Sequence, residues 1–215
     1  FHPKILPSVV ICDPELTVEM SDFITAGTGM DALVQCLEAF SSPHYHPMSQ
    51  GIALEGMRLV KENLTVVYDD PANLTGRAHM MSAAMMGATA FQKGLGAIHA
   101  LSHPIGAIYH THHGTTNAVV MQAVMRFNRS EIEDRFVSAA RYLDIEGGFD
   151  GFYDFVGGLV THLNIPKNLT DLGLRDLGNA DFDRIVAAAL NDPSAGGNPR
   201  ALTAKNTRAL LEACF

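Results

Sequence analysis

Helical periodicity runs through almost the whole sequence and leaves little room for other secondary structure. Apolar residues recur at the i, i+3, i+4, i+7 spacing, as in Met30, Leu33, Val34 and Leu37 after Thr28. Capping residues and prolines mark where such helices begin. The same signals predict further helices from Pro47, from Asp70 to about Gln92, after Gly96, from a Ser130/Glu133 capping box, and over residues 149–163, 180–190 and 203–213. We therefore expect an all-α helical bundle.

One segment departs from this pattern. Residues 9–12 read Val-Val-Ile-Cys and are closed by Asp13-Pro14, which predicts a short strand. The sequence opens on Phe1 rather than Met, so we expect that something precedes it.

Charge and cysteine content exclude several classes of function. The chain has 15 basic and 23 acidic residues, a formal net charge of −8, which disfavours nonspecific binding to nucleic acid or to an anionic membrane. No apolar run reaches the roughly 18 residues of a membrane span. Cys12, Cys36 and Cys214 are an odd number of well-separated cysteines, which favours a reducing cytoplasm over a disulfide scaffold. We therefore expect a cytoplasmic protein without nucleic-acid or membrane partners.

Histidines gather in one short segment. Five of the ten lie within it: His99, His103, His110, His112 and His113. His99 and His103 are four residues apart, so they project from one helix face, and a bend near Gly106 would bring His113 back towards them. Imidazole is a common ligand of divalent transition metals, whereas a single histidine in an apolar helix is more often a hydrogen-bonded core residue. The clustering leaves both interpretations open for His99 and His113, whereas His110 and His112 fit a polar turn.

Asp31 is the carboxylate that could complete such a metal site. It shares a helix face with Gln35, beside the apolar stripe. The alternative is an acidic residue in the first helical turn, where the helix dipole favours it, and spacing alone favours that alternative. No glycine-rich nucleotide loop follows a strand, and the sequence has no Walker loop, His-Glu-x-x-His or Gly-x-Ser-x-Gly.

The helical part also contains two longer motifs. They read Thr28-Gly-Met-Asp31-Ala-Leu and Gly94-x-Gly-x-x-His99-x-x-x-His103-Pro-x-Gly106-x-x-Tyr109-x-x-x-His113-Gly114-x-x-Asn117-Ala118. Both resemble the iron-containing (group III) alcohol dehydrogenase family, and the resemblance runs from about Ile11 to the C-terminus. It implies a helical domain that follows an N-terminal α/β nucleotide-binding domain. On this interpretation residues 1–24 hold a residual strand and the interdomain connection, and residues 25–215 form the helical metal-binding domain.

The resemblance also implies roles for individual residues. Asp31, His99 and His113 are expected to bind Fe²⁺ or Zn²⁺, with a fourth ligand at position 35. The family usually has histidine there, whereas this chain has Gln35, whose amide oxygen is a weaker donor than imidazole. His103 matches a family histidine that faces the nicotinamide and the substrate, which makes it the expected catalytic residue, for proton relay or orientation.

The expected function is NAD- or NADP-dependent interconversion of a small-molecule alcohol with its aldehyde or ketone. The 215 residues alone are expected to be inactive, because they contain no phosphate-binding loop, and a homodimer is compatible with the sequence. A maleylacetate reductase or glycerol dehydrogenase relative is one alternative. A non-enzymatic helical metal-binding module is another.

Overall fold

The computed structural model describes residues 3–5 and 7–215, and within them it is all-α. Its α-helices are α1 (Asp22–Ser41), α2 (Pro47–Asp69), α3 (Leu74–Ala90), α4 (Ala97–Tyr109), α5 (His113–Tyr142), α6 (Gly148–His162), α7 (Asn179–Leu190) and α8 (Ala204–Glu212). Short 3-10 turns are η1 (Pro3–Ile5), η2 (Pro14–Thr17), η3 (Phe91–Lys93) and η4 (Pro193–Gly197). The predicted helical bundle is confirmed. None of these helices is long and apolar enough to cross a membrane.

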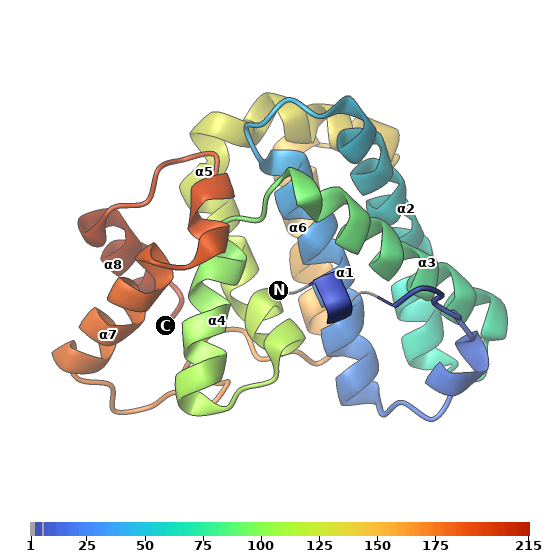
Figure 1. Cartoon of the computed structure of the whole chain (residues 1–215), viewed down its shortest axis with the longest axis horizontal. Helices are drawn as coiled ribbons and strands as arrows, with labels where there is room; N and C mark the ends of the chain where they lie inside the picture. The colour runs from blue at the N-terminus through green and yellow to red at the C-terminus, as the bar shows by residue number, and fades with distance from the viewer. Residues whose placement is uncertain (1–2, 6) are drawn as a thin grey trace.

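Helix α1 lies at the centre of the bundle (Figure 1). It packs against α2, α3 and α5, and 14 of its 20 residues are buried. Helices α7 and α8 pack on each other at one side of the molecule, and α7 also contacts α4. A helix buried on most of its circumference is held by packing on all sides, so the side chains of α1 are well fixed in position.

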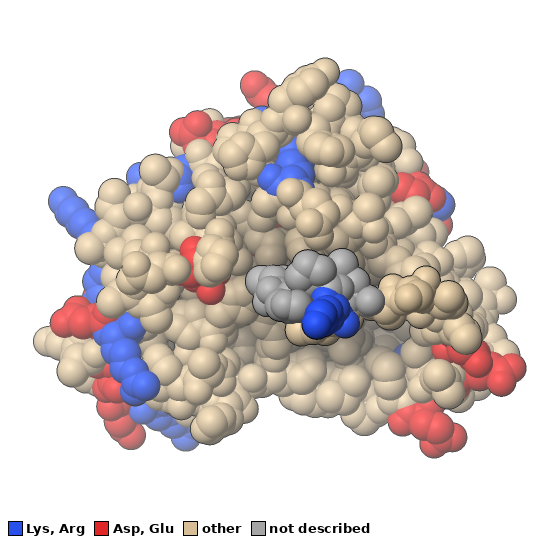
Figure 2. Space-filling view, viewed as in Figure 1, with Lys and Arg blue, Asp and Glu red and all other residues tan. Residues whose placement is uncertain are grey.

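The predicted strand at residues 9–12 is wrong. These residues form no strand, and Val9, Val10 and Ile11 are exposed. A strand needs a neighbour for its ladder of hydrogen bonds, and the described residues include no other strand. On the face shown in Figure 2, many charged side chains lie towards the edges, and Lys or Arg side chains also lie at the centre and above it.

Two predicted helix starts were misplaced. Helix α1 begins at Asp22 rather than after Thr28, because the Ser21 side chain accepts a hydrogen bond from the Ile24 N–H and caps the helix earlier. Helix α3 begins at Leu74 behind an Asn73 cap. Asp70, the predicted cap, instead ends α2. The first correction matters for the site, because it places Asp31 in the middle of α1.

The predicted capping box at Ser130 and Glu133 is also wrong, because α5 runs through both residues without a break. The Ser130 hydroxyl bonds the Glu131 carboxylate instead of a backbone N–H. The predicted helices over 149–163, 180–190 and 203–213 correspond to α6, α7 and α8.

An elbow of three residues, 110–112, turns the chain from α4 into α5. His110 ends α4 in the left-handed conformation, with φ of 57°. His112 caps α5 by accepting a hydrogen bond from the Thr115 N–H. The bend therefore lies at His110 rather than near Gly106, and it makes His113 the first residue of α5.

Helices α1 and α5 approach each other unusually closely next to Asp31. A Cβ added at Gly114 would lie 2.1 Å from the Gly27 carbonyl oxygen and 3.2 Å from Asp31 Cβ. A Cβ at Gly27 would in turn meet the His112 ring at 2.5 Å. Glycine is therefore required at both positions, and the pair determines how near α5 lies to Asp31.

The carboxyl end of α1 is closed by two cations from other elements. Lys93 Nζ donates to the carbonyl oxygens of Ala39 and Ser42, at 2.9 and 2.7 Å. Arg135 donates to the Ser41 and Ser42 carbonyls, at 2.9 and 2.7 Å. Both side chains satisfy carbonyls that have no partner within the helix and oppose the negative end of its dipole.

Candidate metal centre

Three side chains from three helices converge at one point. Asp31 comes from the middle of α1, His99 from the first turn of α4, and His113 begins α5. Asp31 Oδ1 lies 3.7 Å from His99 Nε2 and 3.4 Å from His113 Nε2. One ligand atom from each of the three residues lies within 4.8 Å of the other two. We call these three residues the Asp–His cluster.

Gln35, one turn after Asp31 on α1, contacts the same carboxylate. Its Nε2 donates to Asp31 Oδ2 at 2.8 Å, whereas the distances to the two histidines are measured from Oδ1. Gly87 of α3 leaves little space behind it, since a Cβ there would be 3.0 Å from Gln35 Oε1. The amide is therefore held beside Asp31, with its nitrogen hydrogen-bonded to the carboxylate.

Glu38 supports His99 from behind. Its Oε2 lies 2.7 Å from His99 Nδ1, and its Oε1 accepts the Ile98 backbone N–H at 2.7 Å. Both side chains are only 3% exposed. Sequence reasoning missed Glu38, although a signal existed, because a carboxylate seven residues after Asp31 lies on the same face of an otherwise apolar helix.

Asn117, one turn after His113, belongs to the same sequence motif and contacts all three residues of the Asp–His cluster. Its Nδ2 lies 2.7 Å from Asp31 Oδ1, 3.1 Å from His113 Nε2 and 3.4 Å from His99 Nε2. Its Oδ1 is buried without a hydrogen-bond partner. The acceptor atoms of the Asp–His cluster thus surround a single donor group, which is the arrangement that a cation requires.

The electrostatics of the cluster follow from burial and pairing. Burial raises the pKa of Asp31, but hydrogen bonds and charge interactions with His113 and His99 outweigh it and hold this pKa well below its usual range. Burial lowers the pKa of His99, while Asp31 and Glu38 raise it more, to about 9. The site is therefore built to hold positive charge beside Asp31.

His103 lies beside the cluster rather than within it. Its ring centroid is 5.5 Å from that of His99 and 5.4 Å from that of His113, against which it stacks. Its Nδ1 lies 2.8 Å from Asp192 Oδ2, and Asp192 Oδ1 accepts the Ser194 N–H. The His103 side chain is 41% exposed, so its face remains accessible. Sequence reasoning did not pair these two residues.

The donor set fits a divalent transition metal. One carboxylate and two imidazoles are the ligand types that Fe²⁺ and Zn²⁺ accept. His99 also has the buried carboxylate partner typical of metal-binding histidines. His110 and His112 are outside this set, because both serve the helix elbow, as the polar-turn interpretation predicted.

Comparison with known proteins identifies the fold and the family. The family model described as "Fe-containing alcohol dehydrogenase family, C-terminal" matches residues 25–215. The 4-hydroxybutyrate dehydrogenase of Cupriavidus necator is 38% identical over 99% of this chain and 57% of its own length. The 1,3-propanediol dehydrogenase of Citrobacter freundii is 32% identical over 98% of this chain and 56% of its own.

Solved structures agree with this assignment. A crystal structure of a 1,3-propanediol oxidoreductase matches with a TM-score of 0.91 and 32% identity, over 98% of this chain and 56% of that one. The sulfoacetaldehyde reductase of Bifidobacterium kashiwanohense, solved in complex with NAD⁺, matches with a TM-score of 0.87 and 27% identity, over 97% and 55%. The chain thus spans a little more than half the length of these relatives. It belongs to the iron-containing alcohol dehydrogenase family and corresponds to that family's C-terminal domain.

Proposed function

We propose that this chain is the metal-binding part of an NAD(P)-linked alcohol dehydrogenase. Asp31, His99 and His113 would hold the divalent metal, with Gln35 as the fourth ligand. The observation that carries this proposal is the convergence of the ligand atoms of Asp31, His99 and His113 within 4.8 Å. A divalent metal bound there supplies Lewis-acid polarisation of a substrate hydroxyl or carbonyl oxygen.

His103 is the residue proposed to move the proton. Asp192 accepts a hydrogen bond from Nδ1–H of His103, which leaves Nε2 as the nitrogen that can take or return a proton. Partial exposure allows His103 to exchange that proton with solvent. Asp192 therefore positions His103, and His103 performs general acid–base chemistry.

The redox step needs a hydride carrier, because no side chain transfers hydride. The proposed carrier is NAD or NADP, consistent with the NAD⁺ complex of the sulfoacetaldehyde reductase. The 215 residues contain no glycine-rich phosphate loop after a strand, so the proposal assigns cofactor binding to residues outside them.

The proposed substrate is a short primary alcohol or the corresponding aldehyde. The relatives named for 4-hydroxybutyrate and 1,3-propanediol share a terminal hydroxyl on a short chain. Their identities of 38% and 32% favour this substrate class over maleylacetate, although a maleylacetate reductase structure also matches with a TM-score of 0.82. Partial exposure of His103 and His113 favours an enzyme over a closed structural metal site.

Metal titration tests the proposal directly. Chelator-treated chain is titrated with Fe²⁺ or Zn²⁺ under anaerobic conditions, and bound metal is measured by elemental analysis and calorimetry. We expect one equivalent bound, with affinity lowered by Asp31→Asn and by His113→Ala. His79→Ala is the matched control, because His79 is an exposed residue of α3 outside the cluster. Equal metal binding by Asp31→Asn and the parent chain would refute the assignment.

A further inference from the structure

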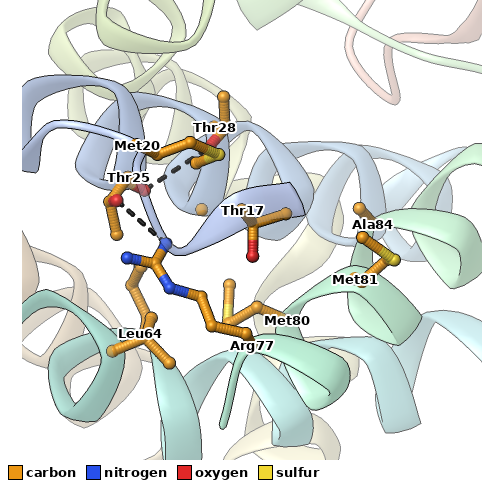
Figure 3. A pocket seen from close by; sticks show the side chains of 11 residues that line it. Thr17, Met20, Thr25, Thr28, Leu64, Arg77, Met80, Met81 and Ala84 are labelled. Atoms are coloured by element: carbon orange, nitrogen blue, oxygen red, sulfur yellow. Dashed lines mark hydrogen bonds between the residues drawn. The ribbon is translucent and has the colours of Figure 1, made fainter. Parts of the chain in front are cut away.

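A separate cavity lies between the first three helices. It has a volume of about 220 Å³ and is bounded by α1, α2, α3, the end of η2 and the residues that follow it (Figure 3). None of the Asp–His cluster residues lines it. Most of its wall is apolar and includes Leu64, Val67, Met80 and Met81. The cavity is therefore distinct from the proposed metal centre.

Among the residues that the structure describes, Arg77 of α3 is the one charged side chain that lines this cavity. The residue is only 3% exposed. Its Nη1 donates to Thr25 Oγ1 at 3.0 Å and its Nε donates to the Pro71 carbonyl at 3.1 Å, as Figure 3 shows for the first of these. Nη2 is buried without an acceptor, and no carboxylate of the described residues forms an ion pair with Arg77. Burial of a guanidinium without a counter-ion is energetically costly.

The remaining polar groups of the cavity cannot serve as that counter-ion. Thr17 Oγ1 donates to the Pro14 carbonyl, and Thr28 Oγ1 donates to the Ile24 carbonyl. Thr25 Oγ1 already accepts from Arg77. The protein thus provides one unneutralised cation, surrounded by apolar walls and by hydroxyl groups that are already engaged.

We propose that this cavity binds a small monocarboxylate with a short apolar chain. The carboxylate would pair with the guanidinium of Arg77, which lines the cavity, and would neutralise its charge, since guanidinium and carboxylate match in charge and geometry. The chain would lie against Leu64, Val67 and the two methionines, where it gains from leaving water. Apolar walls disfavour a multiply charged anion such as phosphate, which would need further donors.

The volume sets the size of this ligand. An apolar cavity of about 150 Å³ is large enough to bind benzene, and this one has about 220 Å³. A carboxylate on a chain of about four to six carbons has that size. This inference is independent of the proposed dehydrogenase function, because it uses none of the cluster residues.

The test is titration of the chain with hexanoate, followed by calorimetry and by NMR of methionine methyl groups. We expect saturable binding, with shifts at Met20, Met80 and Met81, which line the cavity, and not at the exposed Met48. Hexan-1-ol has the same chain without the charge, and it should bind at least about tenfold more weakly. Inorganic phosphate should cause no shift at these methyl groups.

Variants then distinguish the contribution of the Arg77 charge to binding from that of the apolar cavity walls. Arg77→Met should weaken hexanoate binding at least about tenfold and leave hexan-1-ol binding unchanged. Arg175→Met is the matched control, because Arg175 is exposed and has no contact with the cavity. Equal affinities for hexanoate and hexan-1-ol in the parent chain would overturn the proposal, even if Arg77→Met did not fold. No methionine shift with hexanoate would overturn it as well, and would indicate a cavity that holds only water.

Discussion

Glu38 Oε2 lies 2.7 Å from His99 Nδ1, and this contact determines which nitrogen of His99 faces the cluster. The other oxygen of Glu38 is held by the Ile98 N–H, so the carboxylate cannot rotate freely. Because His99 Nδ1 is hydrogen-bonded to Glu38, Nε2 is the nitrogen of His99 that faces Asp31. Glu38 therefore positions His99 without belonging to the cluster.

Glu38→Gln tests that relationship. The Gln side-chain oxygen can still accept from Ile98, but its amide then donates to His99 Nδ1 and places the imidazole proton on Nε2. We expect metal affinity to fall about 10- to 100-fold with little change in fold. Titration calorimetry and circular dichroism measure the two effects. Glu146→Gln, an exposed carboxylate elsewhere, is the control. Unchanged metal affinity in Glu38→Gln would contradict the assigned role.

Gln35→His tests the fourth position of the site. Imidazole is a better ligand than a neutral amide for Fe²⁺ or Zn²⁺, so we expect metal affinity to rise about tenfold or more. Competition with a chromogenic chelator measures the change. An unchanged affinity would place residue 35 outside the coordination sphere and leave it only its hydrogen bond to Asp31.

Asp192→Asn tests the proposed proton path in the complete enzyme. The carboxylate that orients His103 is replaced by an amide, which no longer stabilises a protonated imidazole. We expect kcat for alcohol oxidation to fall about 10²- to 10⁴-fold and its pH profile to shift, while metal content stays unchanged. His103→Gln should have the same effect on kcat. Loss of metal in either variant would instead show a structural role.

Gly114→Ala tests the close approach of α1 and α5. The added methyl group would overlap the Gly27 carbonyl and press on Asp31, so we expect a loss of about 1–3 kcal/mol in the free energy of unfolding and weaker metal binding. Gly158→Ala is the matched control, because nothing lies within 4 Å of its added Cβ inside α6. That control should gain about 0.5–1 kcal/mol. Urea denaturation measures both variants, and equal stabilities would contradict the packing argument.

Because Lys93 is buried, the free energy of unfolding should depend on pH. Burial, helped by repulsion from Arg135, lowers the pKa of Lys93 from 10.5 to about 8 in the folded chain. Between these values the unfolded chain binds more protons, so the free energy of unfolding should rise with pH across this window, by at most about 1.4 kcal/mol per pH unit.

Lys93→Met should remove that rise, so that its stability falls increasingly below that of the parent chain as the pH increases above about 8, where the parent still has a donor to the α1 carbonyls. Urea denaturation at several pH values measures the slope of stability against pH. Lys205→Met, which removes an exposed lysine from α8, should retain the parental slope. Identical slopes for Lys93→Met and the parent chain would refute the effect.

Local signals predicted those parts of the fold that local interactions determine. Pro47 opens α2 and Gly96 precedes α4, as expected, because proline and glycine act on the backbone next to them. The Ser130/Glu133 pattern failed because a capping box is recognised by its spacing alone. That spacing does not show whether the residues before Ser130 are already helical. Here they are, because α5 packs against α4 and α1 and continues through Ser130 and Glu133.

In the candidate site, too, local sequence signals predicted some features, whereas features that depend on packing between distant segments were not predictable. The sequence motif named Asp31, His99 and His113, and the structure brings their ligand atoms together. The alternative for Asp31, a residue in the first turn of its helix, is excluded by the position of Ser21 as the cap. The partner of His103 was not predictable, because Asp192 is 89 residues away and reaches it only through the packing of η4 on α4.

Because of the elbow between α4 and α5, the two histidines of the Asp–His cluster are not held equally firmly in position. His99 is held within the buried first turn of α4, whereas His113 directly follows the three elbow residues and its side chain is 44% exposed. Local opening of a short connection costs far less free energy than unfolding of the core. Exchange of an ion at this site would therefore begin with release of His113, and its rate would be controlled by the elbow while Asp31 and His99 keep their places.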